Sequence, residues 1–230
     1  MKRLLNDGYD AVEELLDGYV KAHGDVVKLA DNERVVVRTT LSAEPKVGII
    51  FGGGSGHEPL FLGYVGEGVA DAAVIGSVNT SPDPIACYDA VTAVDQGKGC
   101  LYLYGNYQGD VLNFDMGAEM ASDDGIRVET VLITDDVYSA KDKADRRGVA
   151  GDLIVLMAAC AVANTGADLA TVKAAAEKAN DNTYSMGVAL SSSTLPVTGQ
   201  PIFDIGPDDM EVGMGIHGEP GIERKKLEPA

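Results

Sequence analysis

The feature that most constrains the fold is a repeated alternation of short apolar runs with stretches of helical spacing. The apolar runs lie at 46–51, 71–76, 100–105 and 128–133, and the helical stretches lie at 83–95, from 110 onward, at 151–164 and at 168–180. Before them, the apolar residues of segment 10–23 recur at three- and four-residue steps, which is typical of an amphipathic helix. Strands that alternate with helices favour a mainly parallel sheet. We therefore predict an α/β domain with a mainly parallel sheet sandwiched by helices.

The pattern changes after Tyr184. Shorter β-like pieces follow at 184–194, 201–205 and 210–217, with proline and glycine between them. We predict additional β strands in this C-terminal part, at one side of the main sheet. The chain then runs into the polar segment 225–230 with no further core element, so we expect a domain truncated or cut from a longer protein.

Length, charge and cysteine content limit the function classes. A chain of 230 residues can bury roughly 70% of its unfolded surface, enough for one large domain or for one domain and a piece of a second. A net charge of −18 argues against nucleic acid and anionic membranes as partners. No apolar run approaches the roughly 20 residues that cross a bilayer, and acidic residues stand where a signal peptide needs apolar ones. We expect a cytoplasmic protein whose three cysteines are buried small hydrophobes.

Three loops are candidates for a binding site, because ligands of open α/β sheets bind beyond the carboxyl ends of the strands. They are 52–59, 105–110 and 215–221. The first begins with three glycines directly after a predicted strand, which indicates a sharp turn whose backbone can approach a small ligand. It matches neither the dinucleotide-binding glycine pattern nor a P-loop, so a nucleotide site on this chain is weakly supported.

The chain has only three histidines. His23 ends the first predicted helix, where we expect it to face solvent. His57 and His217 each lie in a glycine-rich loop with a Glu-Pro pair close behind, which favours a chemical role. Asp110 opens a predicted helix, so it fits a helix N-cap and also a carboxylate that binds a substrate hydroxyl or orients a histidine.

Other chemistries have little support. Ser55 lies near His57, but in a loop unlike the strand-to-helix elbow of serine hydrolases. The histidines have neither the HxxxH nor the HExxH spacing of metal sites, so we predict no metal on this chain.

Five segments together resemble one family. They are FGGGSGHEPLFLGYVGEG at 51–68, SPDP at 81–84, NYQGDVLNF at 106–114, RRGVAG at 146–151 and GMGIHGEPGIERK at 213–225. In this order they resemble the substrate-binding K subunit or domain of the dihydroxyacetone kinases, and the match runs along essentially the whole chain.

The resemblance implies a two-part kinase. The K part binds dihydroxyacetone or a similar short ketose, and a separate L-type subunit or domain carries ATP or ADP with magnesium. We therefore expect no cofactor bound by this chain, an L-type partner and a homodimer. Residues 1–230 would form the ketose-binding α/β domain, with the second domain of the K subunit absent.

The resemblance also assigns site residues. His217 would bond covalently to the substrate carbonyl carbon as a hemiaminal. His57 would accept a proton, Asp110 would bind and help activate the hydroxyl, and the backbone of Gly54, Ser55 and Gly56 would line the pocket.

One departure leaves the substrate open. Family members that use a phosphotransferase-system donor often carry lysine where this chain has Gly105, and its loss would widen the pocket. A kinase for a four-carbon ketose such as erythrulose is therefore an alternative, as is a non-catalytic ketose sensor or coregulator. The donor, ATP or a phosphoprotein, also stays open.

Overall fold

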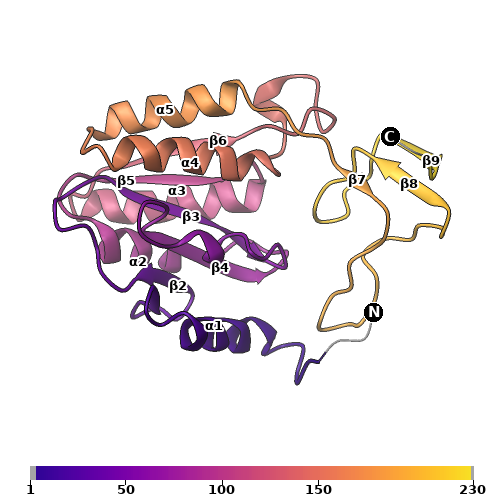
Figure 1. Cartoon of the computed structure of the whole chain (residues 1–230), viewed down its shortest axis with the longest axis horizontal. Coiled ribbons are helices and arrows are strands. Elements are labelled where there is room, and N and C mark those ends of the chain that lie inside the picture. The colour runs from indigo at the N-terminus through magenta and orange to yellow at the C-terminus, as the bar shows by residue number, and fades with distance from the viewer. Residues whose placement is uncertain (1–3, 229–230) are drawn as a thin grey trace.

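The main body of the protein is a six-stranded sheet. The computed structural model describes residues 4–228. The strand order is β1-β2-β4-β3-β5-β6 (Figure 1). The strands are β1 (Val27–Leu29), β2 (Val35–Arg38), β3 (Gly48–Ser55), β4 (Ala72–Val78), β5 (Cys100–Gly105) and β6 (Val128–Ile133). Strands β4, β3, β5 and β6 are parallel to one another, whereas β1 and β2 add an antiparallel edge. The predicted fold class is confirmed, and the two edge strands were not predicted.

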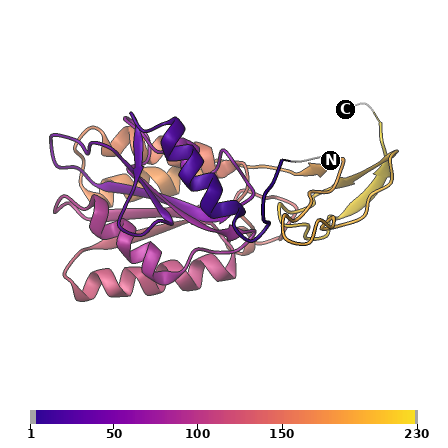
Figure 2. The same cartoon turned by 90° about the horizontal axis from the view of Figure 1, so that it is seen from below.

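Helices cover both faces of this sheet. One face packs against α2 (Pro84–Val94) and α3 (Gln108–Asp123). The other packs against α1 (Ala11–Ala22), α4 (Gly151–Ala163) and α5 (Leu169–Asp181) (Figure 2). Successive residues of β3 point to opposite faces, so Phe51 enters one core and Ile50 the other. Both faces of β3 are therefore buried, as its continuous apolar sequence indicates.

The three glycines after this apolar run belong to the strand, so the predicted sharp turn at this position is wrong. A Cβ on Gly52 would lie 2.7 Å from the ring of Phe114, and one on Gly53 would lie 2.4 Å from the ring of Phe61. A Cβ on Gly54 would lie 2.7 Å from the backbone nitrogen of Thr80. The glycines are needed for close packing, and the turn begins at Gly56, whose φ is +101°.

The C-terminal strands form a sheet of their own and do not extend the main sheet as we expected. Two of the three predicted pieces, 184–194 and 210–217, contain a strand, whereas 201–205 forms none and the strand at 223–226 was not predicted. Residues 182–228, called here the C-terminal unit, contain the antiparallel strands β7 (Val188–Ala189), β8 (Asp209–Val212) and β9 (Glu223–Lys226), which lie beside the main body (Figure 1). All four residues of β9 are charged and exposed, so this strand has no apolar face to bury under a helix. Within the described residues, the one β-bridge between this unit and the main body joins Ser185 to Asp136, in the loop after β6.

Two smaller predictions also have outcomes in the described residues. The three cysteines are buried and free, as expected. His23 follows the end of α1 and is exposed, also as expected. Within 4–228, no helix is long and apolar enough to cross a membrane.

Candidate active site

The two histidines that the sequence singled out meet in space. His57 follows the carboxyl end of β3, and His217 lies in the loop between β8 and β9. Their Nε2 atoms are 3.0 Å apart although 160 positions separate them in the chain. The site therefore combines a side chain of the main body with one of the C-terminal unit.

Glu219 determines which nitrogen of His217 carries a proton. Its Oε1 lies 3.1 Å from His217 Nδ1, and its Oε2 accepts the backbone N–H of His217 at 3.0 Å. Burial raises the pKa of Glu219, but the hydrogen bonds with His217 outweigh this and lower it to about 2. Because an ionised carboxylate only accepts, Nδ1 of His217 carries a proton, and in the neutral imidazole Nε2 keeps its lone pair. In that form His57 Nε2–H donates to His217 Nε2.

His57 is neutral over the physiological pH range. Burial lowers its pKa to about 4, because the imidazolium ion loses its hydration, and the charge of His217 acts in the same direction. Glu219 opposes both effects more weakly. A neutral imidazole keeps one nitrogen free to accept a proton.

Asp110 is a buried carboxyl inside α3, so the N-cap interpretation is wrong. The helix begins two residues earlier, at Gln108, and Tyr107 occupies the N-cap position without a side-chain cap. Among the described residues, Oδ1 of Asp110 has no hydrogen-bond partner. Burial raises the pKa of Asp110 to about 6, against weaker opposing effects of Ser81 and His217. The carboxyl is within electrostatic range of the His217 imidazole and titrates close to neutral pH.

Tyr107 is a site residue that the sequence did not single out. Its ring packs edge-on against His217, with 4.8 Å between centroids, and its hydroxyl donates to the carbonyl of Gly148 at 3.1 Å. A Cβ on Gly105 would lie 3.0 Å from this ring and 3.1 Å from the Gly148 oxygen. The space beside Gly105 is therefore occupied by Tyr107 and Gly148.

Residues 54–56 make contacts within the protein, and their predicted binding role stays a prediction. The Ser55 hydroxyl donates to the carbonyl of Gly76 at 2.9 Å and is 3% exposed, so it points into the protein. The backbone N–H of Gly56 donates to the carboxylate of Glu58 at 3.1 Å. Gly54 approaches the backbone of Thr80 closely.

A second buried carboxyl lies behind the site. Asp152, in the first turn of α4, is 4% exposed, and its Oδ1 has no hydrogen-bond partner among the described residues. Burial raises the pKa of Asp152 well above its ordinary value, and Asp135 and Asp110 add to the rise. Sequence reasoning missed Tyr107, Glu219 and Asp152, although each stands inside or next to a segment that carried the resemblance.

Within residues 4–228, no group of three or more histidine, cysteine, aspartate and glutamate side chains is arranged to hold a metal ion. The chemistry available to the site is that of two imidazoles in contact, of which His57 is neutral, and a carboxyl of raised pKa.

Comparison with known families decides the identity. A family model described as the Dak1 domain matches residues 17–230. The chain belongs to the Dak1 domain family.

Two curated proteins are similar over nearly the whole chain. The dihydroxyacetone-binding subunit DhaK of PTS-dependent dihydroxyacetone kinase 2 from Listeria innocua is 70% identical over 100% of the chain, which spans 70% of that subunit. The L-erythrulose kinase of Pectobacterium atrosepticum is 45% identical over 96% of the chain, which spans 38% of that enzyme.

Solved structures share the fold. The dihydroxyacetone kinase of C. freundii, native and in complex with AMP-PNP and Mg²⁺, matches with a TM-score of 0.89 and 39% identity, over 97% of this chain and 42% of that one. The dihydroxyacetone kinase operon co-activator Dha-DhaQ matches with a TM-score of 0.86 and 31% identity, over 94% of this chain and 66% of that one. This Dak1 chain therefore resembles both kinases and a co-activator.

Proposed function

We propose that this Dak1 chain is the ketose-binding part of a dihydroxyacetone kinase and that it holds its substrate covalently through His217. One observation carries the proposal. Nδ1 of His217 is hydrogen-bonded to the carboxylate of Glu219, so the nitrogen that faces His57, at the carboxyl end of β3, is Nε2. The 70% identity to a dihydroxyacetone-binding subunit supports dihydroxyacetone as the substrate.

The covalent step is an addition. His217 Nε2 attacks the carbonyl carbon, an N–C bond forms, and the π electron pair of the carbonyl moves to its oxygen. That oxygen takes up a proton, and the imidazole gives up its Nδ1 proton, so a neutral hemiaminal forms without a net change in protons. A bond of this kind holds a small polar molecule that offers few other contacts. It also distinguishes ketoses from glycerol, which has no carbonyl.

Phosphoryl transfer needs an acceptor for the proton of the terminal hydroxyl. We assign this role to His57, which is neutral, and we assign binding of the hydroxyl to Asp110. The backbone of Gly54, Ser55 and Gly56 would line the pocket, within a ketose-binding domain at 1–230. Phosphoryl transfer depends chiefly on positioning and on charge neutralisation by magnesium. A partner that carries magnesium would therefore supply the transferred group.

The partner would be an L-type subunit or domain that carries ATP or ADP with Mg²⁺, and we expect a cytoplasmic homodimer. The AMP-PNP and Mg²⁺ in the C. freundii kinase support a nucleotide donor, whereas the name of the Listeria relative supports a phosphotransferase-system donor.

Two alternatives have specific support. Erythrulose as substrate is supported by the L-erythrulose kinase relative, although Tyr107 and Gly148 fill the space beside Gly105 that a wider pocket would need. A coregulator role is supported by the co-activator structure. Phosphorylation of bound ketose by any L-type partner would exclude a pure sensor, whereas tight binding without turnover would favour it.

Intact mass measurement tests the covalent site. Incubation with dihydroxyacetone or erythrulose and gentle native ionisation should add the full mass of one ketose. An imine on a lysine would instead add that mass less one water. The adduct should disappear in His217→Ala and persist in His23→Ala, which removes an exposed histidine. An adduct that survives in His217→Ala, or the absence of any adduct with the wild type, would overturn the covalent proposal.

A further inference from the structure

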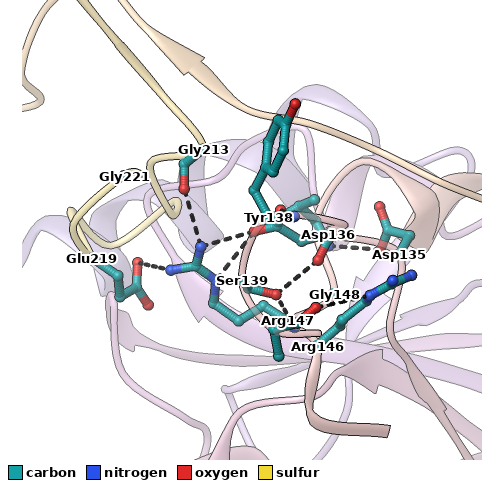
Figure 3. Close-up of polar contacts among 12 residues, drawn as sticks. Asp135, Asp136, Tyr138, Ser139, Arg146, Arg147, Gly148, Gly213, Glu219 and Gly221 are labelled. Atoms are coloured by element: carbon teal, nitrogen blue, oxygen red, sulfur yellow. Dashed lines mark hydrogen bonds and ion pairs between the residues drawn. The ribbon is translucent and has the colours of Figure 1, made fainter. Parts of the chain in front are cut away.

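The second arginine of the RRGVAG segment contacts both parts of the protein, and the chemistry above gives it no role. The guanidinium of Arg147 donates to Asp136 Oδ2 from Nη2 at 2.9 Å and from Nε at 3.2 Å. The same Nη2 donates to the carbonyl of Gly213 at 3.3 Å, and Nη1 lies 3.7 Å from Glu219 Oε2. Figure 3 shows the guanidinium between the loop after β6 and the loop that carries Glu219. Arg147 therefore joins the main body to the C-terminal unit.

The main-body end of this connection is firmly held. Asp136 is 1% exposed, its backbone N–H donates to the carbonyl of Arg147 at 3.0 Å, and its Oδ1 accepts the backbone N–H of Tyr138 at 3.2 Å. The backbone N–H of Arg147 donates to the Ser139 hydroxyl at 2.9 Å. The side chain of Arg147 is 14% exposed, so its ion pair with Asp136 is largely shielded from water. The position of the guanidinium is consequently set by the main body.

The other end of the connection is the carboxylate that orients His217. Oε2 of Glu219 faces both Arg147 and the backbone N–H of His217, while Oε1 faces Nδ1 of His217. Contacts on both oxygens, including the ion pair with Arg147, restrict rotation of the carboxylate away from the imidazole. Carboxylates that hold one nitrogen of a histidine fix its tautomer and ring orientation in many sites.

We propose that Arg147 is a positioning residue, which holds Glu219 against the main body so that His217 keeps its proton on Nδ1 and presents Nε2 to His57. This role rests on the proposed function insofar as the presented Nε2 is the nucleophile. The series His217, Glu219, Arg147, Asp136 thus links the reacting atom to the end of β6. Arg147 does not touch the reacting atoms and acts only through Glu219.

The neighbouring arginine is a matched control. The guanidinium of Arg146 donates to the backbone carbonyls of Ala140 and Lys141, within its own loop. Replacing it with methionine removes the same charge at the adjacent position and leaves the contacts of Glu219 intact.

The experiment measures the tautomer of His217 in the protein labelled with ¹⁵N-histidine, without ketose. Three histidines give few resonances, and His217→Ala identifies the one of interest. The wild type and Arg146→Met should show a single His217 tautomer protonated on Nδ1. Arg147→Met should show a mixture of tautomers, and Arg147→Lys should restore the Nδ1–H form in part, because an ammonium can still contact a carboxylate.

A second variant keeps the test usable if Arg147→Met fails to fold. Arg147→Met leaves the carboxylate of Asp136 buried without its partner, which is strongly destabilising. The double variant Arg147→Met with Asp136→Asn removes this unpaired charge and keeps the loop shape. A folded single or double variant whose His217 tautomer equals that of Arg146→Met would overturn the positioning role.

Adduct formation then separates this inference from the proposed function. If the covalent proposal holds, ketose affinity in the Arg147→Met variants should fall about tenfold or more, the size of effect seen when a supporting partner of a metal-binding histidine is removed. Absence of an adduct in the wild type would overturn the covalent proposal, whereas the tautomer comparison would still decide the role of Arg147.

Discussion

His57 and His217 share one hydrogen bond, with 3.0 Å between their Nε2 atoms. The lone pair that His217 would use on a carbonyl carbon is the one that accepts this bond. A ketose must therefore replace His57 as the partner of His217. Ketose binding is assigned to His217 and proton acceptance to His57, so substituting one residue at a time can separate the two steps.

Replacing His57 with alanine should affect turnover more than binding. His217 and Glu219 remain, so the equilibrium yield of the ketose adduct should stay near that of the wild type. Turnover with a competent L-type partner should fall by about 10²–10⁴-fold, the usual contribution of a general base. Native mass measurement and a coupled phosphorylation assay report the two quantities. Full turnover in His57→Ala would remove this residue from the mechanism.

The lowered pKa of His57 predicts a loss of stability at acidic pH. An imidazole with a pKa of about 4 in the folded protein and 6.5 unfolded binds fewer protons when folded. Its contribution to stability is therefore complete above pH 6.5 and declines as the pH falls towards 4. Urea unfolding between pH 7 and 4 should show a weaker decline in His57→Asn than in the wild type. His23→Asn, at an exposed position, is the control, and identical pH profiles in His57→Asn and the wild type would contradict the prediction.

Asp110 should show the opposite pH dependence. With a folded pKa of about 6 and an ordinary value of 3.8, its carboxyl binds more protons when folded. Stability is therefore unaffected below pH 4 and falls as the pH rises from about 4 to 6, by roughly 2–3 kcal/mol in total. Asp110→Asn should be more stable than the wild type at pH 7 and about equally stable at pH 4, while losing turnover. The exposed Asp115 of the same helix, changed to asparagine, is the control. If the difference in free energy of unfolding between Asp110→Asn and the wild type were the same at pH 4 and at pH 7, the raised pKa of Asp110 would be refuted.

Gly105 should resist enlargement because of Tyr107. A Cβ at this position would lie 3.0 Å from the Tyr107 ring, so Gly105→Ala has to displace a side chain that packs on His217. We expect a loss of about 1–3 kcal/mol in the free energy of unfolding and a weaker ketose adduct. Gly18→Ala is the matched control, since its Cβ would meet nothing within 4 Å inside α1 and alanine favours helix there. A Gly105→Ala variant as stable as the wild type would show that Tyr107 moves freely.

Glycine positions illustrate why sequence reasoning succeeded and failed within one segment. The run after Phe51 was interpreted as a turn because glycine permits unusual backbone angles. In the structure these glycines are extended and make room for Phe61, Phe114 and the backbone of Thr80, which come from other parts of the chain. The backbone preference of a glycine does not indicate which side chains from other parts of the chain will pack against it. The same limitation hid the N-terminal start of α3 and so the burial of Asp110.

The sequence alone determined the α/β class and the alternation of strands and helices, and it singled out the His57 and His217 loops as candidates. These follow from local periodicity and from residue types that stand together in short motifs. Only the tertiary structure decided that the two histidines meet, that residues 182–228 form their own small sheet, that Tyr107 packs on His217, and that Arg147 contacts Glu219. The contacts of His57, Tyr107 and Arg147 with the loop of His217 join segments more than 60 positions apart, and side-chain spacing along the chain does not encode the distance between such segments.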